Sequence, residues 1–241
     1  MGVLLIGFRV GCAPIFMERR AIIQTLYDNL AHKSSVLTGK GVAKVDLTSQ
    51  GVRVMTSDGS LYSGDVLIGA DGVHSSVRAH MWDIAAMQRP GFFPSRDTTA
   101  VHTTYCCIFG ISKPGKGFPQ HQTTHVQGKG HSYLLSTGPG NAVYWFLFKK
   151  LDIPLRGPPD STPRYTDAER DTLAQAHADD ILSTTLTFGA LYRAKTTATL
   201  QTLPEVLFKT WHYKRIMTIG DAAHKVRRDD MLALMVLNGR S

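Results

Sequence analysis

Two short stretches of the sequence constrain the fold more than any other feature. Each combines an apolar run, a turn in which glycine and aspartate are adjacent, and small or polar residues that can begin a helix. Continuous apolar runs of this kind are typical of strands covered on both faces in an α/β sheet. The corners are residues 66–70 followed by Asp71 and Gly72, and residues 215–219 followed by Gly220 and Asp221.

The residues between the two corners carry mostly strand signals, broken by loops rich in proline and glycine. A chain of this pattern leaves one sheet, builds a β-rich unit and returns to the first sheet. Thr166 and Glu169 have the spacing of a capping box, so a helix is expected to begin there. We predict strands at 103–111 and 142–148, loops at 114–119 and 138–140, a surface connector at 155–163, and helices at 166–176 and 187–193.

The residues before the first corner predict a helix and a strand meander. Ile22, Ile23, Leu26 and Leu30 recur at helical spacing, which is typical of a helix with one apolar face. An Asp-Gly pair at 58–59 is typical of a hairpin turn. We predict a helix at 19–30, strands at 41–47, 52–56 and 61–63, and a helix at 73–81 after the first corner.

Composition argues against several classes of protein. Lys and Arg outnumber Asp and Glu by 27 to 19, a net charge of +8, but these charges are dispersed. We find no helix-turn-helix, zinc-finger or RRM signature and expect no nucleic-acid partner. No apolar run approaches the ~18 residues of a membrane-spanning helix. Residues 1–6 are apolar but too short for a signal peptide.

Three cysteines do not make a disulfide framework. Cys106 and Cys107 are adjacent, and adjacent residues on a strand face opposite ways. We interpret these two and Cys12 as small buried hydrophobic residues. No histidine lies beside them in a metal-ligand spacing, so the sequence indicates no metal site.

The residue types at the corners suit a nucleotide-like ligand. A helix N-terminus presents unpaired N–H groups that can bind phosphate, and glycine lets the backbone approach a ligand closely. An aspartate at a strand's carboxyl edge can accept hydrogen bonds from a ribose or ribitol hydroxyl. Ala222 and Ala223 are expected to leave room for a bulky ligand. A purely structural role stays open, because Asp is a common helix cap and Gly is common in turns.

Both corners resemble motifs of single-component FAD-dependent monooxygenases. Residues 69–78 resemble the "DG" motif and residues 220–225 the "GD" motif. Residues 16–20, leading into a helix, look like the family's arginine-bearing helix, with Arg19 as the better match and Arg20 as the second. Residues 144–148 and 210–212 look like the subgroup of fungal secondary metabolism, which includes epoxidases acting on prenylated indoles and meroterpenoids. The resemblance runs from about residue 14 to Lys225.

The resemblance implies a flavoprotein oxidoreductase that binds FAD and uses NADPH or NADH and O2. It would insert one oxygen atom, as an epoxide or a hydroxyl, into an apolar secondary metabolite such as a terpenoid or meroterpenoid. No residue is assigned to catalysis. By the resemblance, the cofactor-binding residues are Arg19, Arg20, Asp71, Gly72, Arg78, Gly220 and Asp221.

The resemblance also implies an α/β fold, α+β overall. A partial FAD-binding, Rossmann-like region would carry an inserted β-rich substrate domain. We expect three segments: residues 1–98, with the arginine helix, the meander and the DG motif; residues 99–210, the substrate domain; and residues 211–241, which return to the FAD-binding region and carry the GD motif.

Two departures from the family pattern lower the expected affinity for FAD. The sequence has no G-x-G-x-x-G run before the arginine helix, so the adenine half of the site is expected to be missing. After Lys225 the sequence lacks the family's Pro- and Gly-rich segment. We expect weak FAD binding and little turnover by this chain alone.

Three readings compete. The first is a monooxygenase, and the second is an inactive remnant or interaction module that binds no flavin. A weaker third is a nucleic-acid-binding protein, which would bind in a salt-sensitive way. For the first we expect a cytoplasmic protein, with membrane association in a full-length form.

Overall fold

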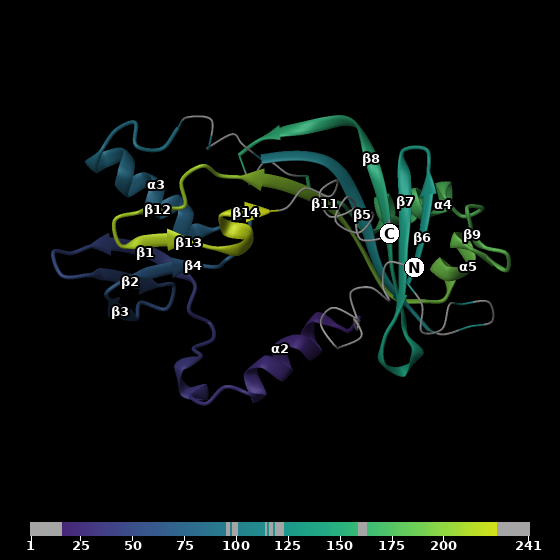
Figure 1. Cartoon of the computed structure of the whole chain (residues 1–241), viewed down its shortest axis with the longest axis horizontal. Coiled ribbons are helices and arrows are strands. Elements are labelled where there is room, and N and C mark those ends of the chain that lie inside the picture. Colours follow the sequence, from purple (N-terminus) through teal and green to yellow (C-terminus); the bar gives the residue numbers. More distant parts are fainter. Residues whose placement is uncertain are drawn as a thin grey trace, which may run out of the picture.

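A computed structural model describes residues 16–94, 97, 101–113, 115, 118, 123–158 and 163–225 (Figure 1). The long strands β5, β8 and β11 run between two groups of elements. One group holds a large antiparallel sheet with two helices. The other holds a small meander, a helix and the short strands that carry the two corners.

The large sheet has six strands in the order β14-β11-β5-β8-β7-β6, and every neighbouring pair is antiparallel. Helices α4 and α5 and the short strands β9 and β10 pack on it. Trp145, Phe188 and Leu191 are completely buried in this core. The elements are β5 (Val101–Ser112), β6 (Thr123–Gly128), β7 (His131–Thr137), β8 (Val143–Gly157), α4 (Asp167–Ala176), β9 (Ile181–Ser183), β10 (Leu186–Thr187), α5 (Phe188–Arg193), β11 (Lys195–Leu207) and β14 (His224–Lys225).

The second group is built around α3 (Ser76–Gln88). Val77 and Met81 of this helix pack against Val45 and Val52 of the meander and against Ile216 of a three-stranded sheet. That sheet has the order β12-β13-β4. Its strands are β12 (His212–Tyr213), β13 (Ile216–Thr218) and β4 (Leu67–Gly69), and the meander is β1 (Val42–Leu47), β2 (Val52–Thr56) and β3 (Leu61–Gly64).

The strand of the first corner differs from expectation. We predicted a strand covered on both faces, but Val66 and Ile68 are 56% and 52% exposed. Met217, the register partner of Ile68, is 39% exposed as well. The prediction was wrong because, among the described residues, α3 covers one face of this sheet and the other face lies open.

The N-terminal helix is α2 (Arg19–Asp28), two residues shorter than predicted. Its predicted apolar face is present in the sequence, yet Ile22, Ile23 and Leu26 are all exposed. Only the residues just before the helix approach the large sheet, where the ring of Phe16 lies 6.2 Å from that of Phe146. Most of α2 therefore extends away from the body of the molecule (Figure 1).

Three other predictions need comment. The helix after the first corner begins at Ser76 rather than 73, because Ser75 and not Val73 caps it. The connector predicted at 155–163 was wrong at its start, since β8 continues to Gly157. Cys106 and Cys107 are free and buried, as predicted, and Cys12 lies outside the described residues.

The capping box of α4 gives a first testable prediction. The Thr166 hydroxyl accepts a bond from the Glu169 amide, and the Glu169 carboxylate accepts one from the Thr166 amide. Thr166→Ala should lower the free energy of unfolding by about 1 kcal/mol, because one helix amide loses its acceptor. Urea denaturation followed by circular dichroism measures the change. Thr166→Ser keeps the oxygen and should cost clearly less; equal losses for both variants would contradict the capping role.

Candidate functional site

The two corners lie side by side at one edge of the small sheet. Strands β4 and β13 are parallel, with Gly69 opposite Thr218. The Ile219 amide donates to the Gly69 carbonyl at 2.9 Å, which extends the pairing into the turns. Both turns therefore leave from carboxyl ends of adjacent parallel strands, the position where open α/β sheets bind ligands.

Each corner turns through a glycine in the left-handed region. Gly72 has φ +84° and Gly220 has φ +58°, and no heavy atom stands within 4 Å of where a Cβ would lie on either. The requirement for glycine here is conformational, because other residues adopt this region at a cost. The open space over both residues leaves the backbone accessible from solvent.

Asp71 lies at the first corner and caps helix α3. Its Oδ2 accepts bonds from the Ser76 hydroxyl at 3.1 Å and the Val77 amide at 3.2 Å. Burial acts to raise the pKa of Asp71, but hydrogen bonds from Ser75, Val77 and Ser76 outweigh it and hold the pKa below its usual value. The carboxylate therefore stays ionised, and the helix end that we expected to be open to phosphate has two of its amides occupied: that of Val77 by Asp71 and that of Arg78 by Ser75.

Arg78 ties the two corners together. Its side chain is buried, and Nη1 donates to the Ala222 carbonyl at 2.7 Å while Nη2 donates to the Val73 carbonyl at 2.5 Å. The guanidinium also lies over the rings of Phe208 and Trp82, with centroid distances of 4.5 and 5.3 Å. It holds the DG turn against the GD turn from within.

Asp221 is the acidic group that the second corner presents to solvent. Its side chain is 58% exposed, and its nearest described cation is the Lys225 ammonium, 3.9 Å away. Ala222 and Ala223 behave differently from our expectation. Both are completely buried, so their small side chains serve packing under the turn and leave no room for a ligand there.

Arg19 and Arg20 begin α2 and are exposed. In Figure 1, α2 stands apart from β4, β13 and the turns that follow them. The structure thus brings together Asp71, Gly72, Arg78, Gly220 and Asp221, and it leaves the two arginines elsewhere. Their role as cofactor contacts stays a prediction, as do the roles of the other five.

A cleft of about 730 Å³ opens beside the corners. Its volume lies within the ~300–1,000 Å³ usual for small-molecule sites. Val73 and His74 reach it from the first corner and Lys225 from the second. The opposite walls come from the large sheet and the approach to α4, and are formed by Pro163, Arg164, Tyr165, Thr199, Leu200, Gln201, Thr202 and Pro204.

Comparison with known proteins agrees with this geometry. The FAD-dependent monooxygenase spyC of Aspergillus fumigatus is 39% identical over 219 residues, which make up 90% of this chain and 46% of that protein. The FAD-dependent monooxygenase andE of Emericella variicolor is 37% identical over 221 residues, 92% of this chain and 46% of that protein. The chain is homologous to fungal FAD-dependent monooxygenases. The predicted family is confirmed, and the chain spans less than half the length of these relatives.

Solved structures support the same fold. HpxO of Klebsiella pneumoniae, solved with FAD, has a TM-score of 0.70 at 23% identity and covers 99% of this chain and 60% of its own. A salicylate hydroxylase in complex with substrate has a TM-score of 0.54 at 18% identity, covering 86% of this chain and 51% of its own. At these identities the likeness shows the fold alone, a mixed α/β architecture of the flavoprotein hydroxylase kind. No family model matches the chain.

Two groups of residues escaped the sequence analysis. The β11 residues that line the cleft, Thr199 to Pro204, carry no motif and read only as part of a β-rich stretch. The side chains of His131, His177 and Asp180 converge although about fifty residues separate the first from the others. Only the i,i+3 spacing of His177 and Asp180 was visible in the sequence.

Proposed function

We propose that the chain carries part of the FAD site of a monooxygenase that acts on an apolar secondary metabolite. The observation that carries the proposal is the parallel pairing of β4 and β13, which sets a DG turn and a GD turn at one sheet edge. Homology to FAD-dependent monooxygenases supports the same reading. Bound flavin, reduced by NADPH or NADH, would supply the reaction of O2 with the substrate.

The residues at the corners fit parts of such a cofactor. Asp221 offers an exposed, ionised carboxylate that can accept hydrogen bonds from ribityl hydroxyls. The uncovered backbone of Gly72 and Gly220 lets a flat or phosphorylated ligand approach closely. Asp71 and Arg78 act from behind, by fixing α3 and the two turns in place. Arg19 and Arg20 would contact FAD only if α2 lay nearer to the corners than it does here.

The substrate would occupy the cleft between the corners and the large sheet. Leu200, Pro163 and Val73 give it apolar wall, and Tyr165 and the threonines of β11 give it hydroxyl groups. Such a mixed lining suits a mostly apolar molecule with a few oxygens, of which a terpenoid or meroterpenoid is one class. We place epoxidation and hydroxylation as the two reactions to be tested, in a cytoplasmic protein.

A second candidate function is an inactive module that binds no flavin. The observation that favours it is the position of α2, whose arginines lie apart from the corners in the described structure. The sequence also holds no G-x-G-x-x-G run. FAD affinity separates the two candidates.

Asp221→Asn tests the proposal. If the carboxylate accepts ribityl hydroxyls, FAD affinity should fall about tenfold, because one charge-assisted hydrogen bond contributes roughly 1.5 kcal/mol or more. Flavin fluorescence during titration with protein measures the dissociation constant for both forms. Asp83→Asn removes the same charge from an exposed position on α3 and should leave the affinity unchanged. Equal affinity for the Asp221 variant and the unaltered chain would exclude a role for this carboxylate.

A further inference from the structure

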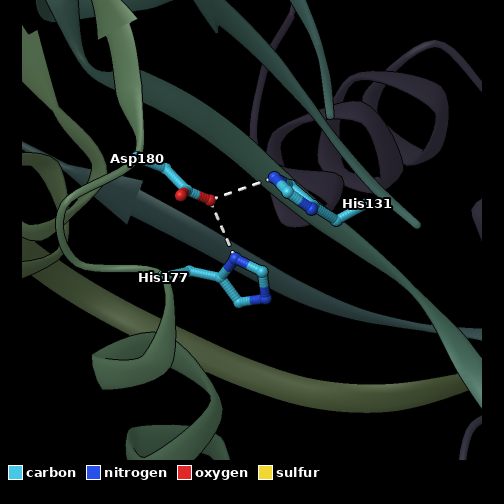
Figure 2. A group of neighbouring side chains, drawn as sticks. All are labelled: His131, His177 and Asp180. Atoms are coloured by element: carbon cyan, nitrogen blue, oxygen red, sulfur yellow. Dashed lines mark hydrogen bonds and ion pairs between the residues drawn. The ribbon is translucent and has the colours of Figure 1, made fainter. Parts of the chain in front are cut away.

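Two histidines and an aspartate meet on the large-sheet side of the molecule, away from the corners. His131 begins β7, His177 caps the C-terminus of α4, and Asp180 lies just before β9. Figure 2 shows both imidazole rings directed at the same carboxylate oxygen. The Oδ2 of Asp180 is 3.0 Å from His131 Nε2 and 2.8 Å from His177 Nδ1.

The cluster is partly enclosed and its side chains are held in place. The side chains of His131 and His177 are 18% and 11% exposed, and that of Asp180 is 33% exposed. The Tyr133 hydroxyl donates to Asp180 Oδ2 at 2.6 Å. Burial acts to raise the pKa of Asp180, but hydrogen bonds from Tyr133 and His177 outweigh it and lower the pKa, so the carboxylate is ionised near neutral pH.

The surroundings of His131 resemble those of a metal ligand. Nε2 faces the carboxylate, and Nδ1 lies 3.3 Å from the Lys129 carbonyl oxygen. A metal-binding histidine commonly donates its second ring N–H to a carbonyl or a carboxylate, which fixes the ring and its tautomer. The Lys129 carbonyl would do this for a ligand that binds through Nε2.

The ligand atoms have the number and spacing that a small divalent cation requires. One nitrogen from each imidazole and one carboxylate oxygen all lie within 4.8 Å of one another. Zinc is bound by histidine nitrogen and carboxylate oxygen at ~2.0–2.2 Å, and sites with three protein ligands keep a fourth position for water. We propose that His131, His177 and Asp180 form a binding site for a divalent cation of the zinc type.

The position of this site indicates a structural role. His131 belongs to the large sheet, whereas His177 and Asp180 belong to the turn that joins α4 to β9. Below them, Tyr133 packs against Phe188 with ring centroids 5.1 Å apart. A cation bound by all three ligands would fasten this turn to the sheet, and its energy of binding would add to the stability of the fold.

Calorimetric titration with Zn²⁺ of the chain, freed of metal by a chelator, tests the proposal. We expect one saturable site at neutral pH, with a dissociation constant on the order of 1 µM, or roughly −8 kcal/mol. His177→Asn and His131→Asn should each weaken binding at least tenfold. His32→Asn, which changes an exposed histidine outside the cluster, should leave binding unchanged. No saturable binding, or binding unaltered in both cluster variants, would overturn the proposal.

A second measurement does not depend on how the variants fold. Co²⁺ replaces zinc in such sites, and its visible absorption reports on the ligands and geometry around it. The unaltered chain with one equivalent of Co²⁺ should show the intense bands of a four-coordinate nitrogen and oxygen site, and Zn²⁺ should abolish them. A spectrum like that of Co²⁺ in water would overturn the proposal.

Discussion

Arg78→Ala is expected to lower the free energy of unfolding by about 3–5 kcal/mol, since hydrogen bonds to a charged group contribute ~1.5–3 kcal/mol each. The guanidinium donates to the Ala222 and Val73 carbonyls and lies between the rings of Phe208 and Trp82. Its removal would leave two carbonyl oxygens without these donors and a cavity between the corners. Urea denaturation followed by circular dichroism measures the loss.

Arg53→Ala is the matched control, because Arg53 is exposed on β2 and away from the corners. We expect its effect to stay within about 0.5 kcal/mol. Arg78→Lys should fall between the two, since a single ammonium cannot reach both carbonyls with the same geometry. An Arg78→Ala variant as stable as the Arg53→Ala variant, but with much weaker FAD binding, would show that Arg78 contacts the cofactor instead of clamping the turns.

Trp145→Ala should destabilise the large-sheet lobe by about 3–5 kcal/mol, the usual cost of truncating a fully buried tryptophan. Trp145 is completely buried, and its ring lies 5.4 Å from that of Phe188. Its Nε1 donates to the Ser112 hydroxyl at 2.8 Å, and that hydroxyl donates to the Leu191 carbonyl at 2.8 Å. The side chain thus joins β8, β5 and α5, and thermal or urea denaturation will report its loss.

Trp211→Ala provides the comparison. Trp211 is 38% exposed, stacks on His224 and donates to the Phe208 carbonyl. A partly exposed ring loses less on truncation, so we expect a cost of less than about 2 kcal/mol. If both tryptophan variants lost the same stability, the packing around Trp145 would not be the main support of this lobe.

Local signals in the sequence predicted several elements closely. Strand β2 was predicted with its observed bounds, because the β-rich residues 52–56 are followed directly by an Asp-Gly hairpin turn. Helix α4 begins after Thr166, where the capping box was recognised. Each of these elements is fixed by neighbours within a few residues in the chain.

Elements set by distant contacts were predicted less well. Strand β8 was expected to end near residue 148, yet it runs to Gly157 despite Pro154. The pairing with β5 explains this, because the register passes from Tyr105↔Lys150 to Thr103↔Leu155. Residues 151–154 form an irregularity in which the proline needs no ladder hydrogen bond, and pairing resumes beyond it.

The same distinction applies to the candidate site. The sequence identified the glycines and aspartates of both corners, because each corner is a local motif. It did not reveal that Arg78 faces inward, since that depends on a carbonyl of Ala222, 144 residues away. Nor did it reveal the meeting of His131 with His177, which depends on how α4 returns onto the large sheet.

Amide chemical-shift changes during an FAD titration test the central claim most directly, namely that the paired corners bind the cofactor. The account predicts saturable shifts for residues 69–78 and 218–225, with a dissociation constant on the order of 100 µM, or roughly −5.5 kcal/mol. Shifts should be small in the meander and around α5. Saturable shifts confined to other parts of the chain, or none at millimolar FAD, would contradict it and favour the module that binds no flavin.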